Sequence, residues 1–350
     1  MSQLNSNPIL ITMGDAAGIG PEIIAKAFRD HPLDVAGCLV VGDVASMRRA
    51  AAFVAMPLAL PVAEFDSIGD FAGCDLPPRC IPVLQKCELL APVSIGLVSG
   101  LAGQAAADCI VWAAQAVLNG QAGAMVTAPI HKEALAAAGG WAAQFPGHTE
   151  MLQFEAAKFM GKSVQDLPVR MMLANDELKT VLVSIHMSLR QAIEAVTFDN
   201  ILQTLRITHA ALGKTLGRPP HIAVAGLNPH AGEGGLFGFE EQTIIAPAMA
   251  AARAEGLNVS GPFAPDTVFM RARAKNGQAG EFDVVVAMYH DQGLIPVKYL
   301  GVEQGVNVTL GLPLVRTSPD HGTAFDIAGT GKADAASLVA AIRMARRLAG

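Results

Sequence analysis

The segment that decides the fold covers residues 282–326 and reads FDVVVAMYHDQGLIPVKYLGVEQGVNVTLGLPLVRTSPDHGTAFD. It begins with a continuous apolar run, residues 284–288, which is typical of a strand buried on both faces of a parallel sheet. Polar side chains and a glycine follow at once, in residues 289–293. Because ligands bind at the carboxyl edge of open α/β sheets, this pattern predicts an α/β enzyme with a site at that edge.

A second buried strand is predicted over residues 306–310, and polar residues follow it too. They are Arg316, Thr317, Ser318, Asp320 and His321. Between the two strands, Lys298 stands in a short and mostly apolar segment. Charged residues next to predicted buried strands are rarely needed for the fold itself, so the whole segment indicates a substrate site.

Length and composition set the class of protein. A chain of 350 residues exceeds what one hydrophobic core usually supports, so we expect two lobes, residues 1–130 plus 285–350 and residues 131–284. Hydrophobic residues make up 51% and charged residues only 16%, which suits an α/β enzyme with both sheet faces covered. A formal net charge of −6 without a basic cluster argues against nucleic acid as a partner.

The cysteines and the amino terminus indicate the compartment. The five cysteines are odd in number and include no Cys-x-x-Cys pair, which indicates neither a disulfide framework nor a thiolate zinc site. The first residues lack the basic region and apolar core of a signal peptide, and no apolar run reaches the roughly 18 residues that span a bilayer. We therefore expect a cytoplasmic protein without a membrane partner.

A glycine-rich turn joins the first predicted strand, residues 9–13, to a helix that runs to about Arg29. Its glycines, Gly14, Gly18 and Gly20, are spaced G-x-x-x-G-x-G and not as the dinucleotide fingerprint G-x-G-x-x-G. Two interpretations stay open, a tight strand-to-helix turn or a cradle for an anion or another ligand.

Apolar periodicity predicts further elements along the chain. Strands are expected at residues 35–41, 124–127, 169–174, 180–185 and 221–227. Helices are expected at residues 44–55, 100–119, 189–196, 199–212, 240–255 and 334–348. Residues 57–98 are rich in Pro and Gly and carry little signal.

Residues 146–150, PGHTE, open another predicted helix, which runs to about Phe159. Thr149 is placed to cap this helix. The backbone N–H groups at a helix start also receive anions such as phosphate, and His148 would stand beside them. A cap is the simpler interpretation, and an anion site is the alternative.

Three histidines share one context, since each lies within a few residues of the end of a predicted apolar strand. They are His186, His230 and His290. Histidine is a common ligand of zinc-like ions, and three ligands with an open position form a catalytic site. Their spacings of 44 and 60 residues match no local metal motif, so a structural or ligand-contacting role stays open for each.

Together, these motifs resemble one family over nearly the whole chain. The segments are ITMGDAAGIGPE, PGHTE, GLNPHAGEGG, AMYHDQG and GVNVTLGLPLVRTSPDHGTA. The chain is similar to the 4-hydroxythreonine-4-phosphate dehydrogenases of vitamin B6 biosynthesis. The resemblance implies a two-lobed α/β/α fold like that of isocitrate and isopropylmalate dehydrogenases. It also implies an active site in the cleft between the lobes and a homodimer that completes each site.

The resemblance further implies cofactors and site residues. The divalent metal ligands, for zinc, magnesium or cobalt, would be His186, His230 and His290, with one donated across the dimer. The substrate contacts would be His148, Thr149, Lys298, Asn307 and Arg316. Lys298 and Asp291 are the candidate catalytic residues, with Lys298 either transferring a proton or supplying a fixed charge, and Asp291 supporting the metal ligands. NAD or NADP would accept the hydride.

The implied reaction oxidises 4-hydroxy-L-threonine 4-phosphate at its secondary hydroxyl, and decarboxylation then gives 3-amino-2-oxopropyl phosphate. The chain departs from the family where Ala16 and Ser188 replace usual prolines. Residues 325–327 look more like a paralogous branch, the 4-phospho-D-threonate and 4-phospho-D-erythronate dehydrogenases. A third branch oxidises an aromatic cis-dihydrodiol, against which the intact anion-binding residues argue. A catalytically inactive binding homologue is the remaining alternative.

Overall fold

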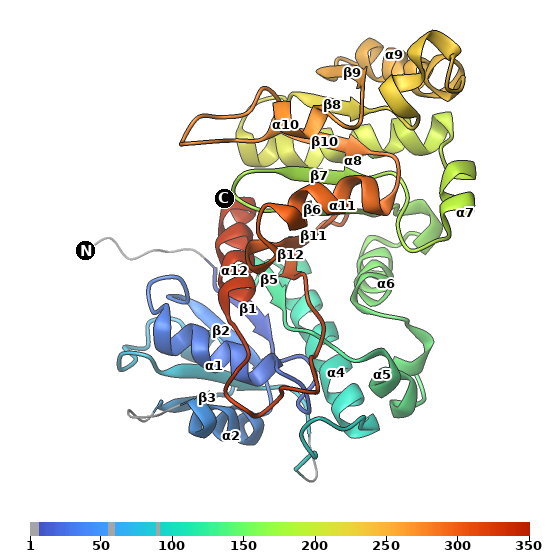
Figure 1. The fold of residues 1–350 in the computed structure, drawn as a ribbon. Helices are drawn as coiled ribbons and strands as arrows, with labels where there is room; N and C mark the ends of the chain where they lie inside the picture. Colours follow the sequence, from blue (N-terminus) through green and yellow to red (C-terminus); the bar gives the residue numbers. More distant parts are fainter. Residues whose placement is uncertain (1–6, 55–59, 89–91) are drawn as a thin grey trace. The chain divides into compact units, whose positions relative to one another are not determined.

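The computed structural model describes residues 7–54, 60–88 and 92–350. The chain forms two compact units. Unit 1 comprises Met1–Leu167 and Leu312–Gly350, and unit 2 comprises Pro168–Gly311. Each unit is a sheet with helices packed on it, as Figure 1 shows, so the α/β class expected from the sequence is confirmed.

Unit 1 is built on a parallel sheet in the strand order β3-β4-β2-β1-β5-β12. The strands are β1 (Ile9–Thr12), β2 (Cys38–Gly42), β3 (Val62–Phe65), β4 (Ile81–Gln85), β5 (Ala124–Thr127) and β12 (Arg316–Pro319). The central strands β1, β2 and β5 are fully buried, which explains their nearly continuous apolar sequences. Thr12 and Thr127 end two neighbouring strands in register, so polar atoms reach the carboxyl edge side by side.

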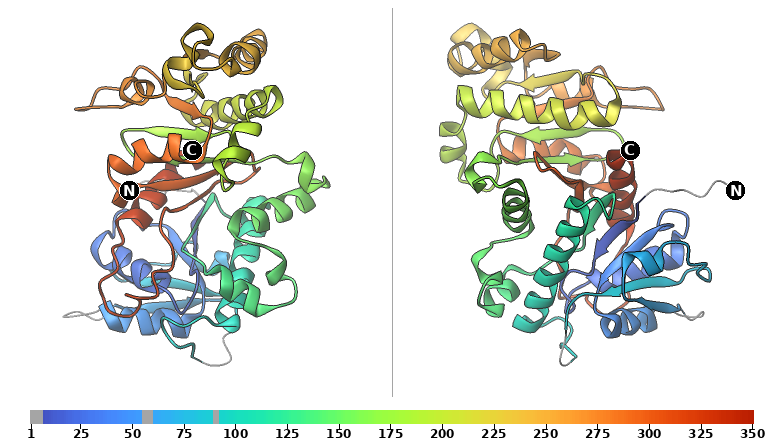
Figure 2. Two further views of the ribbon diagram at one scale, coloured as in Figure 1. Left: turned by 45° about the vertical axis from the view of Figure 1, so that its right-hand side comes forward. Right: turned by 180° about the vertical axis from the view of Figure 1, so that it is seen from behind.

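Helices cover both faces of this sheet. Helix α1 (Gly20–Asp30) packs on α12 (Ala336–Ala349), and α12 contacts β5 and β12. Helix α4 (Gly100–Leu118) packs on β1, β2 and β5, and it faces the viewer in the rear view of Figure 2, whereas α1 faces the viewer in Figure 1. Although α4 is long and apolar enough to cross a membrane, most of it is buried, as expected of a core helix.

The remaining helices of unit 1 pack on these. Helix α2 (Val44–Val54) lies against α1, and α5 (Lys132–Ala138) and α6 (His148–Met160) lie against α4. The short helix α3 (Ile68–Phe71) follows β3. A Cβ at Gly103 would overlap the backbone carbonyl of Ala134, so glycine is what lets α4 and α5 approach so closely.

Unit 2 has a mixed sheet in the strand order β11-β6-β7-β10-β8-β9. The strands are β6 (Arg170–Ala174), β7 (Lys179–Leu182), β8 (Ile222–Ala225), β9 (Val259–Phe263), β10 (Val284–Ala287) and β11 (Val306–Leu310). Strand β6 is antiparallel to β11 and β7, whereas β7, β10, β8 and β9 are parallel. The carboxyl ends of β7, β10 and β8 therefore meet at one edge of the sheet.

Two helices cover opposite faces of the unit 2 sheet. Helix α11 (His290–Tyr299) is in front of β7 in Figure 1, and α8 (Phe198–Leu216) is in front of it in the rear view of Figure 2. Helix α9 (Ala246–Ala254) packs on α8 and continues from a π-helical turn, Glu241–Ile245. The other helices are α7 (Leu189–Glu194) and α10 (Val268–Ala272).

The unit boundaries differ from the expected lobes, residues 1–130 plus 285–350 and residues 131–284. Residues 131–167 belong to unit 1 because α5 and α6 pack on α4. Residues 285–311 belong to unit 2 because β10 pairs with β7 and β8, and β11 pairs with β6. Periodicity identifies a strand from local sequence, but it does not say which sheet that strand joins.

Most predicted elements occur within a few residues of the expected bounds. The helix expected at residues 44–55 is present to Val54, and Ala55 lies outside the described residues. The sequence did not predict β3, β4, β9, β12 or α10. It also missed α11, which begins at His290 and has Pro296 in its interior.

Candidate active site

The three candidate metal histidines follow neighbouring parallel strands of unit 2. His186 follows β7, His230 follows β8 and His290 follows β10, and β10 lies between the other two strands. All three residues therefore lie at the carboxyl edge of one sheet, where the sequence pattern placed them. This is the edge at which open α/β sheets bind ligands.

Two of these histidines lie together. The ring centroids of His186 and His290 are 5.7 Å apart, and the ring planes are tilted by 47°. A tetrahedral ion with metal–nitrogen bonds of about 2.1 Å places two ligand imidazole centroids roughly 5–6 Å apart. The observed separation fits two ligands of one ion.

Asp291 holds the ring of His290. The Nδ1 atom of His290 lies 2.7 Å from Oδ1 of Asp291. An ionised carboxylate only accepts hydrogen bonds, so Nδ1 carries the hydrogen and Nε2 presents its lone pair. This is the tautomer that a metal ion at Nε2 would require, and a supporting role of Asp291 behind a metal ligand stays a prediction.

His230 is in a different setting. It lies in a loop, Pro229–Gly235, where its Nδ1 is 2.9 Å from Oε2 of Glu233. Within one chain, the described residues contain no group of three or more His, Cys, Asp or Glu side chains that could hold a metal ion. A single chain therefore brings His186 and His290 together without His230.

Gln292 lies beside the candidate histidines, and the sequence motifs assigned it no role. It lies in the first turn of α11, where its Oε1 accepts a hydrogen bond from the Met288 N–H at 2.7 Å. Its Nε2 donates to the carbonyl of Gly226 at 2.8 Å. Gln292 therefore ties the end of β10 to the end of β8, the strands that precede His290 and His230.

The other predicted unit 2 residues are Lys298 and Asn307. Lys298 lies in the last turn of α11, roughly 12 Å along the helix axis from His290. Asn307 lies in β11, and both residues are half-buried. Both predicted roles of Lys298, proton transfer and fixed charge, are compatible with this position.

The predicted anion-binding residues of unit 1 include a buried cation. Arg316, in β12, is only 4% exposed, and its Nε and Nη2 atoms donate to Oγ1 of Thr127 at 3.0 and 2.7 Å. Burial lowers the pKa of the Arg316 guanidinium to about 10, although the charge of Glu150 acts in the opposite direction. The protein therefore keeps a positive charge where solvation is poor.

His148 lies within the field of Arg316. Burial, and then the charge of Arg316, lower the pKa of His148 well below its usual value, although a hydrogen bond to the backbone of Ala128 opposes them. Its Nε2 atom is buried and has no hydrogen-bond partner among the described residues. A buried and unpartnered ring nitrogen beside a buried cation is the local environment that an anionic ligand would complete.

The interpretation of Thr149 as a helix cap is wrong. The N-cap of α6 is Gly147, and no side chain caps the helix there. Thr149 is instead the second residue of the helix. The first N–H groups of α6 have no acceptor within the helix, which leaves the anion interpretation of this stretch standing.

The glycine-rich turn of unit 1 is packed against the chain itself. A Cβ at Gly20 would overlap the Met13 carbonyl, and the Ile19 N–H donates to the carbonyl of Thr323 at 3.0 Å. These contacts support the tight-turn interpretation. They also show that the turn binds a distant part of its own chain.

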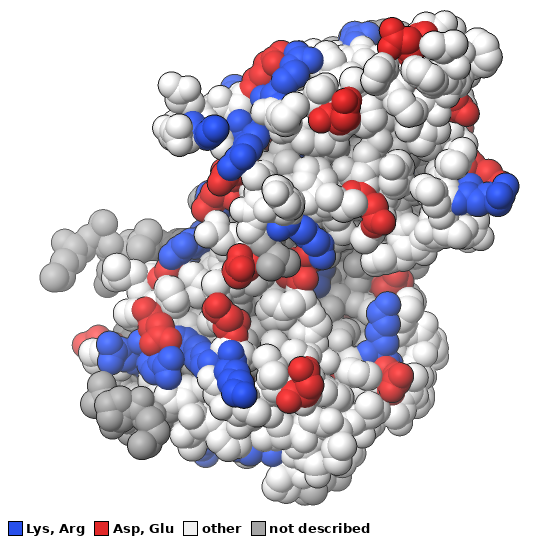
Figure 3. Space-filling view, viewed as in Figure 1, with Lys and Arg blue, Asp and Glu red and all other residues white. Residues whose placement is uncertain are grey.

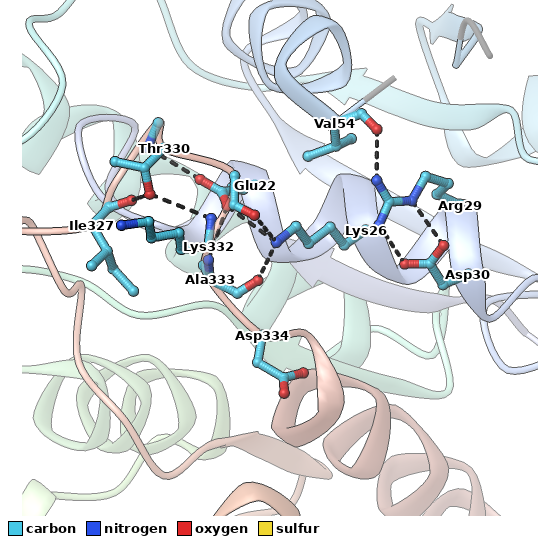
Figure 4. A network of polar contacts seen from close by, with 12 residues as sticks. Glu22, Lys26, Arg29, Asp30, Val54, Ile327, Thr330, Lys332, Ala333 and Asp334 are labelled. Carbon is cyan, nitrogen blue, oxygen red and sulfur yellow. Dashed lines mark hydrogen bonds and ion pairs between the residues drawn. The ribbon is translucent and has the colours of Figure 1, made fainter. Parts of the chain in front are cut away.

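A buried carboxylate at the start of α1 strengthens this attachment (Figure 4). Glu22 accepts hydrogen bonds from the N–H groups of Gly329 and Ala333, both at 3.1 Å. Lys26 lies 3.4 Å from Glu22 and donates to the carbonyl of Gly331 at 2.7 Å and to that of Ala333. Glu22 and Lys26 together hold residues 329–333 against helix α1.

Surface charge does not single out a site on the face that Figure 3 shows. Basic and acidic side chains are interspersed there among uncharged residues. With a net charge of −6, the global field repels anions. Recognition of an anionic ligand must therefore depend on local groups such as those around Arg316.

Comparison with known proteins identifies the family. The model of the family described as "Pyridoxal phosphate biosynthetic protein PdxA" matches residues 34–345. The chain belongs to this family. It is 52% identical over 343 residues to the 4-hydroxythreonine-4-phosphate dehydrogenase of Beijerinckia indica, covering 98% of this chain and 95% of that protein.

Other PdxA relatives carry a different substrate in their names. Over 348 residues, the chain is 42% identical to the D-threonate 4-phosphate dehydrogenase of Salmonella typhimurium, covering 99% of this chain and 100% of that protein. The crystal structure of 4-hydroxythreonine-4-phosphate dehydrogenase from Klebsiella pneumoniae superimposes with a TM-score of 0.85 at 42% identity, covering 99% and 100%. The family resemblance seen in the sequence is thus confirmed, and the chain is an oxidoreductase of the PdxA family.

Proposed function

We propose that this protein oxidises 4-hydroxy-L-threonine 4-phosphate at its secondary hydroxyl with NAD or NADP, and that decarboxylation then yields 3-amino-2-oxopropyl phosphate. The 52% identity to a relative named for this substrate supports the choice. The alternative is 4-phospho-D-threonate or 4-phospho-D-erythronate, which residues 325–327 and the 42% identity to the Salmonella protein favour.

The observation that carries the proposal is the buried Arg316 together with the buried Nε2 atom of the half-buried His148. A phosphate beside Arg316 would offset the cost of burying its positive charge. The same negative charge would raise the pKa of His148 and allow its unpartnered Nε2 to donate a hydrogen bond. Thr149 and the N–H groups at the start of α6 would supply neutral donors.

The residues of unit 2 would carry the chemistry. His186 and His290, with His230 of a second copy, would hold a divalent ion such as zinc, magnesium or cobalt. The ion would supply positive charge for the negative charge that develops on the hydroxyl oxygen, and NAD or NADP would accept the hydride. Asp291 would keep His290 in the tautomer that binds the ion. Lys298 and Asn307 would contact the substrate, with Lys298 as the candidate for proton transfer.

A homodimer accounts for the third histidine. The loop that carries His230 leads into apolar side chains that are exposed in one chain, Leu236 at 73%, Phe237 at 47% and Phe239 at 62%. Exposed apolar groups of this kind mark contact surfaces, and a twofold dimer uses the same surface of each copy. We propose that this surface brings His230 to the partner's histidines.

All five cysteines are free, which fits a reducing compartment such as the cytoplasm.

The test compares the rate of NAD(P) reduction on 4-hydroxy-L-threonine 4-phosphate, 4-phospho-D-threonate and their dephosphorylated forms, with and without a divalent metal. We expect kcat/KM to fall by roughly 100-fold without the phosphate, since each hydrogen bond to a charged group is worth about 1.5–3 kcal/mol. Equal activity with and without phosphate would end the phosphate proposal. A strong preference for 4-phospho-D-threonate would select the other branch, and no activity on any of them would leave a binding homologue.

Lys298→Ala separates the two roles of that residue. A loss of kcat would indicate proton transfer, whereas a raised KM with unchanged kcat would indicate a fixed charge for the substrate.

A further inference from the structure

We propose that Glu233 is a positioning residue that holds the imidazole of His230 ready to bind a divalent cation. The inference rests on the proposed metal-dependent function and assigns a role to a carboxylate that the sequence motifs leave without one. It is carried by three features of the loop: the contact between the two side chains, the backbone conformation and the anchoring of the loop.

The contact matches the one at His290. Oε2 of Glu233 lies 2.9 Å from Nδ1 of His230, and Oδ1 of Asp291 lies 2.7 Å from Nδ1 of His290. In both pairs the carboxylate accepts, so the hydrogen stays on Nδ1 and Nε2 is left for a metal ion. One pair joins neighbouring residues at a helix start, and the other spans three residues of a loop. Two different backbones thus reach the same arrangement.

The backbone of the loop is held in an unusual conformation. Three non-glycine residues take left-handed φ angles, His230 at 52°, Ala231 at 54° and Glu233 at 43°. Side chains disfavour this region, and it persists only where the surroundings over-determine it. His230 and Glu233 both belong to this strained run, so the conformation that costs stability is the one that brings their side chains together.

Buried hydrogen bonds hold the loop in this conformation. Glu241 is only 3% exposed, and its Oε1 accepts hydrogen bonds from the N–H groups of Leu227 and Asn228, both at 2.8 Å. The side-chain amide of Asn228 donates to Glu241 at 3.0 Å and to Glu240 at 2.7 Å. Beyond the loop, the Phe237 N–H donates to the Gly232 carbonyl at 3.2 Å. The start of the loop is therefore fixed on a buried carboxylate, and its end is closed by a hydrogen bond to the loop's own Gly232.

The side chains that this anchored loop presents are themselves exposed. The side chains of His230 and Glu233 are 61% and 54% exposed. An exposed contact between two such side chains adds little to stability, so it does not account for the strain of the loop. Presentation of an oriented imidazole to a ligand does account for it.

The experiment measures binding of Co²⁺ alone to the metal-free, full-length protein by calorimetric titration. We expect Glu233→Gln and Glu233→Ala to weaken Co²⁺ binding by about 10- to 100-fold, as loss of a carboxylate behind a ligand histidine typically does. Glu233→Asp should recover part of the affinity. Glu281→Gln is the matched control, because Glu281 is also an exposed acid of unit 2, paired with Arg271.

A second readout does not depend on the metal. In ¹⁵N NMR spectra of the metal-free protein, the His230 ring should be the Nδ1–H tautomer in the wild type and a mixture of tautomers in Glu233→Gln. If the wild type binds Co²⁺ and Glu233→Gln shows the same affinity and the same tautomer, the proposed role of Glu233 is overturned. The proposed metal site would stand. A wild-type protein that binds no Co²⁺ would overturn the proposed metal site and this inference with it.

Discussion

Two glycine-rich stretches follow buried parallel strands in this protein, and they serve different ends. The turn of residues 14–22 follows β1 in unit 1, and the loop of residues 228–235 follows β8 in unit 2. Each is anchored by a buried glutamate, Glu22 at 2% exposure and Glu241 at 3%. The sequence signal is therefore similar, but the two glutamates bond to different parts of the chain.

In unit 1, Glu22 bonds to the distant residues 329–333, and within the turn only a glycine, Gly14, has a left-handed φ. In unit 2, Glu241 bonds to its own loop, and non-glycine residues there are left-handed. The first arrangement joins segments of the fold. The second holds side chains toward solvent. Glycine after a strand thus predicts a turn. What the turn does is shown by two further features, the groups that its anchoring carboxylate bonds to and the residues that have positive φ.

The largest effect should come from removing the anchor in unit 1. We expect Glu22→Ala to lower the free energy of unfolding by about 3–5 kcal/mol, because it removes the acceptor of two inward-facing N–H groups and the negative charge beside Lys26. Urea unfolding measures this. Glu233→Ala, in the exposed loop, should cost no more than about 0.5 kcal/mol. Similar costs for the two variants would break the comparison.

Glycine substitutions test the same contrast in the backbone. Gly20→Ala should destabilise unit 1 by about 3 kcal/mol, since the new Cβ would overlap the Met13 carbonyl and backbone must move. Gly234→Ala meets nothing within 4 Å but keeps a φ of +66°, so it should cost only about 1–2 kcal/mol. Thermal or urea unfolding of both variants decides the order. The reverse order would mean that the loop, and not the turn, is the tightly packed element.

The sequence predicted those parts of the molecule that depend on local pattern. Apolar runs identified β1, β5, β10 and β11, and the histidines that follow three of the unit 2 strands were correctly placed at strand ends. Strand β12 was missed because its sequence, RTSP, is polar although it is fully buried. Its arginine and threonine are accommodated by contacts with β5 and α12, which no local pattern encodes.

The partners of the site residues were beyond the sequence for a related reason. The Glu233 contact depends on a run of left-handed residues, and the sequence around His230 gives no sign of it beyond its glycines. The clamp between Glu22 and residues 329–333 spans about three hundred positions in the chain. The bounds of the two units differ from those of the expected lobes for the same reason, because sheet membership is decided by distant pairing.

His148 of unit 1, which is half-buried with a buried Nε2 atom, predicts a pH effect of intermediate size. Burial and Arg316 lower the pKa of His148 in the folded state, so between that pKa and the ordinary value of about 6.5 the unfolded chain binds more protons. Stability from the neutral ring is present above pH 6.5 and is lost as the pH falls below it, by at most about 1.4 kcal/mol per pH unit.

We expect His148→Gln to reduce this slope in urea unfolding between pH 5.0 and pH 6.5. His230→Gln is the matched control, because it makes the same substitution in the exposed loop. If the pH slope changes in His230→Gln and not in His148→Gln, the pH effect does not come from His148 and the prediction is wrong.

The smallest effect should come from relieving the strain of the loop. Ala231 has a φ of +54°, where an L side chain costs about 1–2 kcal/mol. Glycine removes that cost but adds roughly 0.5–1 kcal/mol of backbone entropy, so Ala231→Gly should raise the free energy of unfolding by about 0.5–1 kcal/mol. Because the relaxed loop would visit more conformations, Co²⁺ affinity should fall severalfold as stability rises.

Ala324→Gly is the matched control, because Ala324 has a φ of +41° in unit 1, a few residues before the segment 329–333 that Glu22 and Lys26 hold. It should gain similar stability without a change in Co²⁺ affinity. If both variants gained stability and neither lost affinity, the strain at Ala231 would be incidental to metal binding. If only Ala231→Gly lost affinity, the left-handed run would be the feature that prepares His230 for its ion.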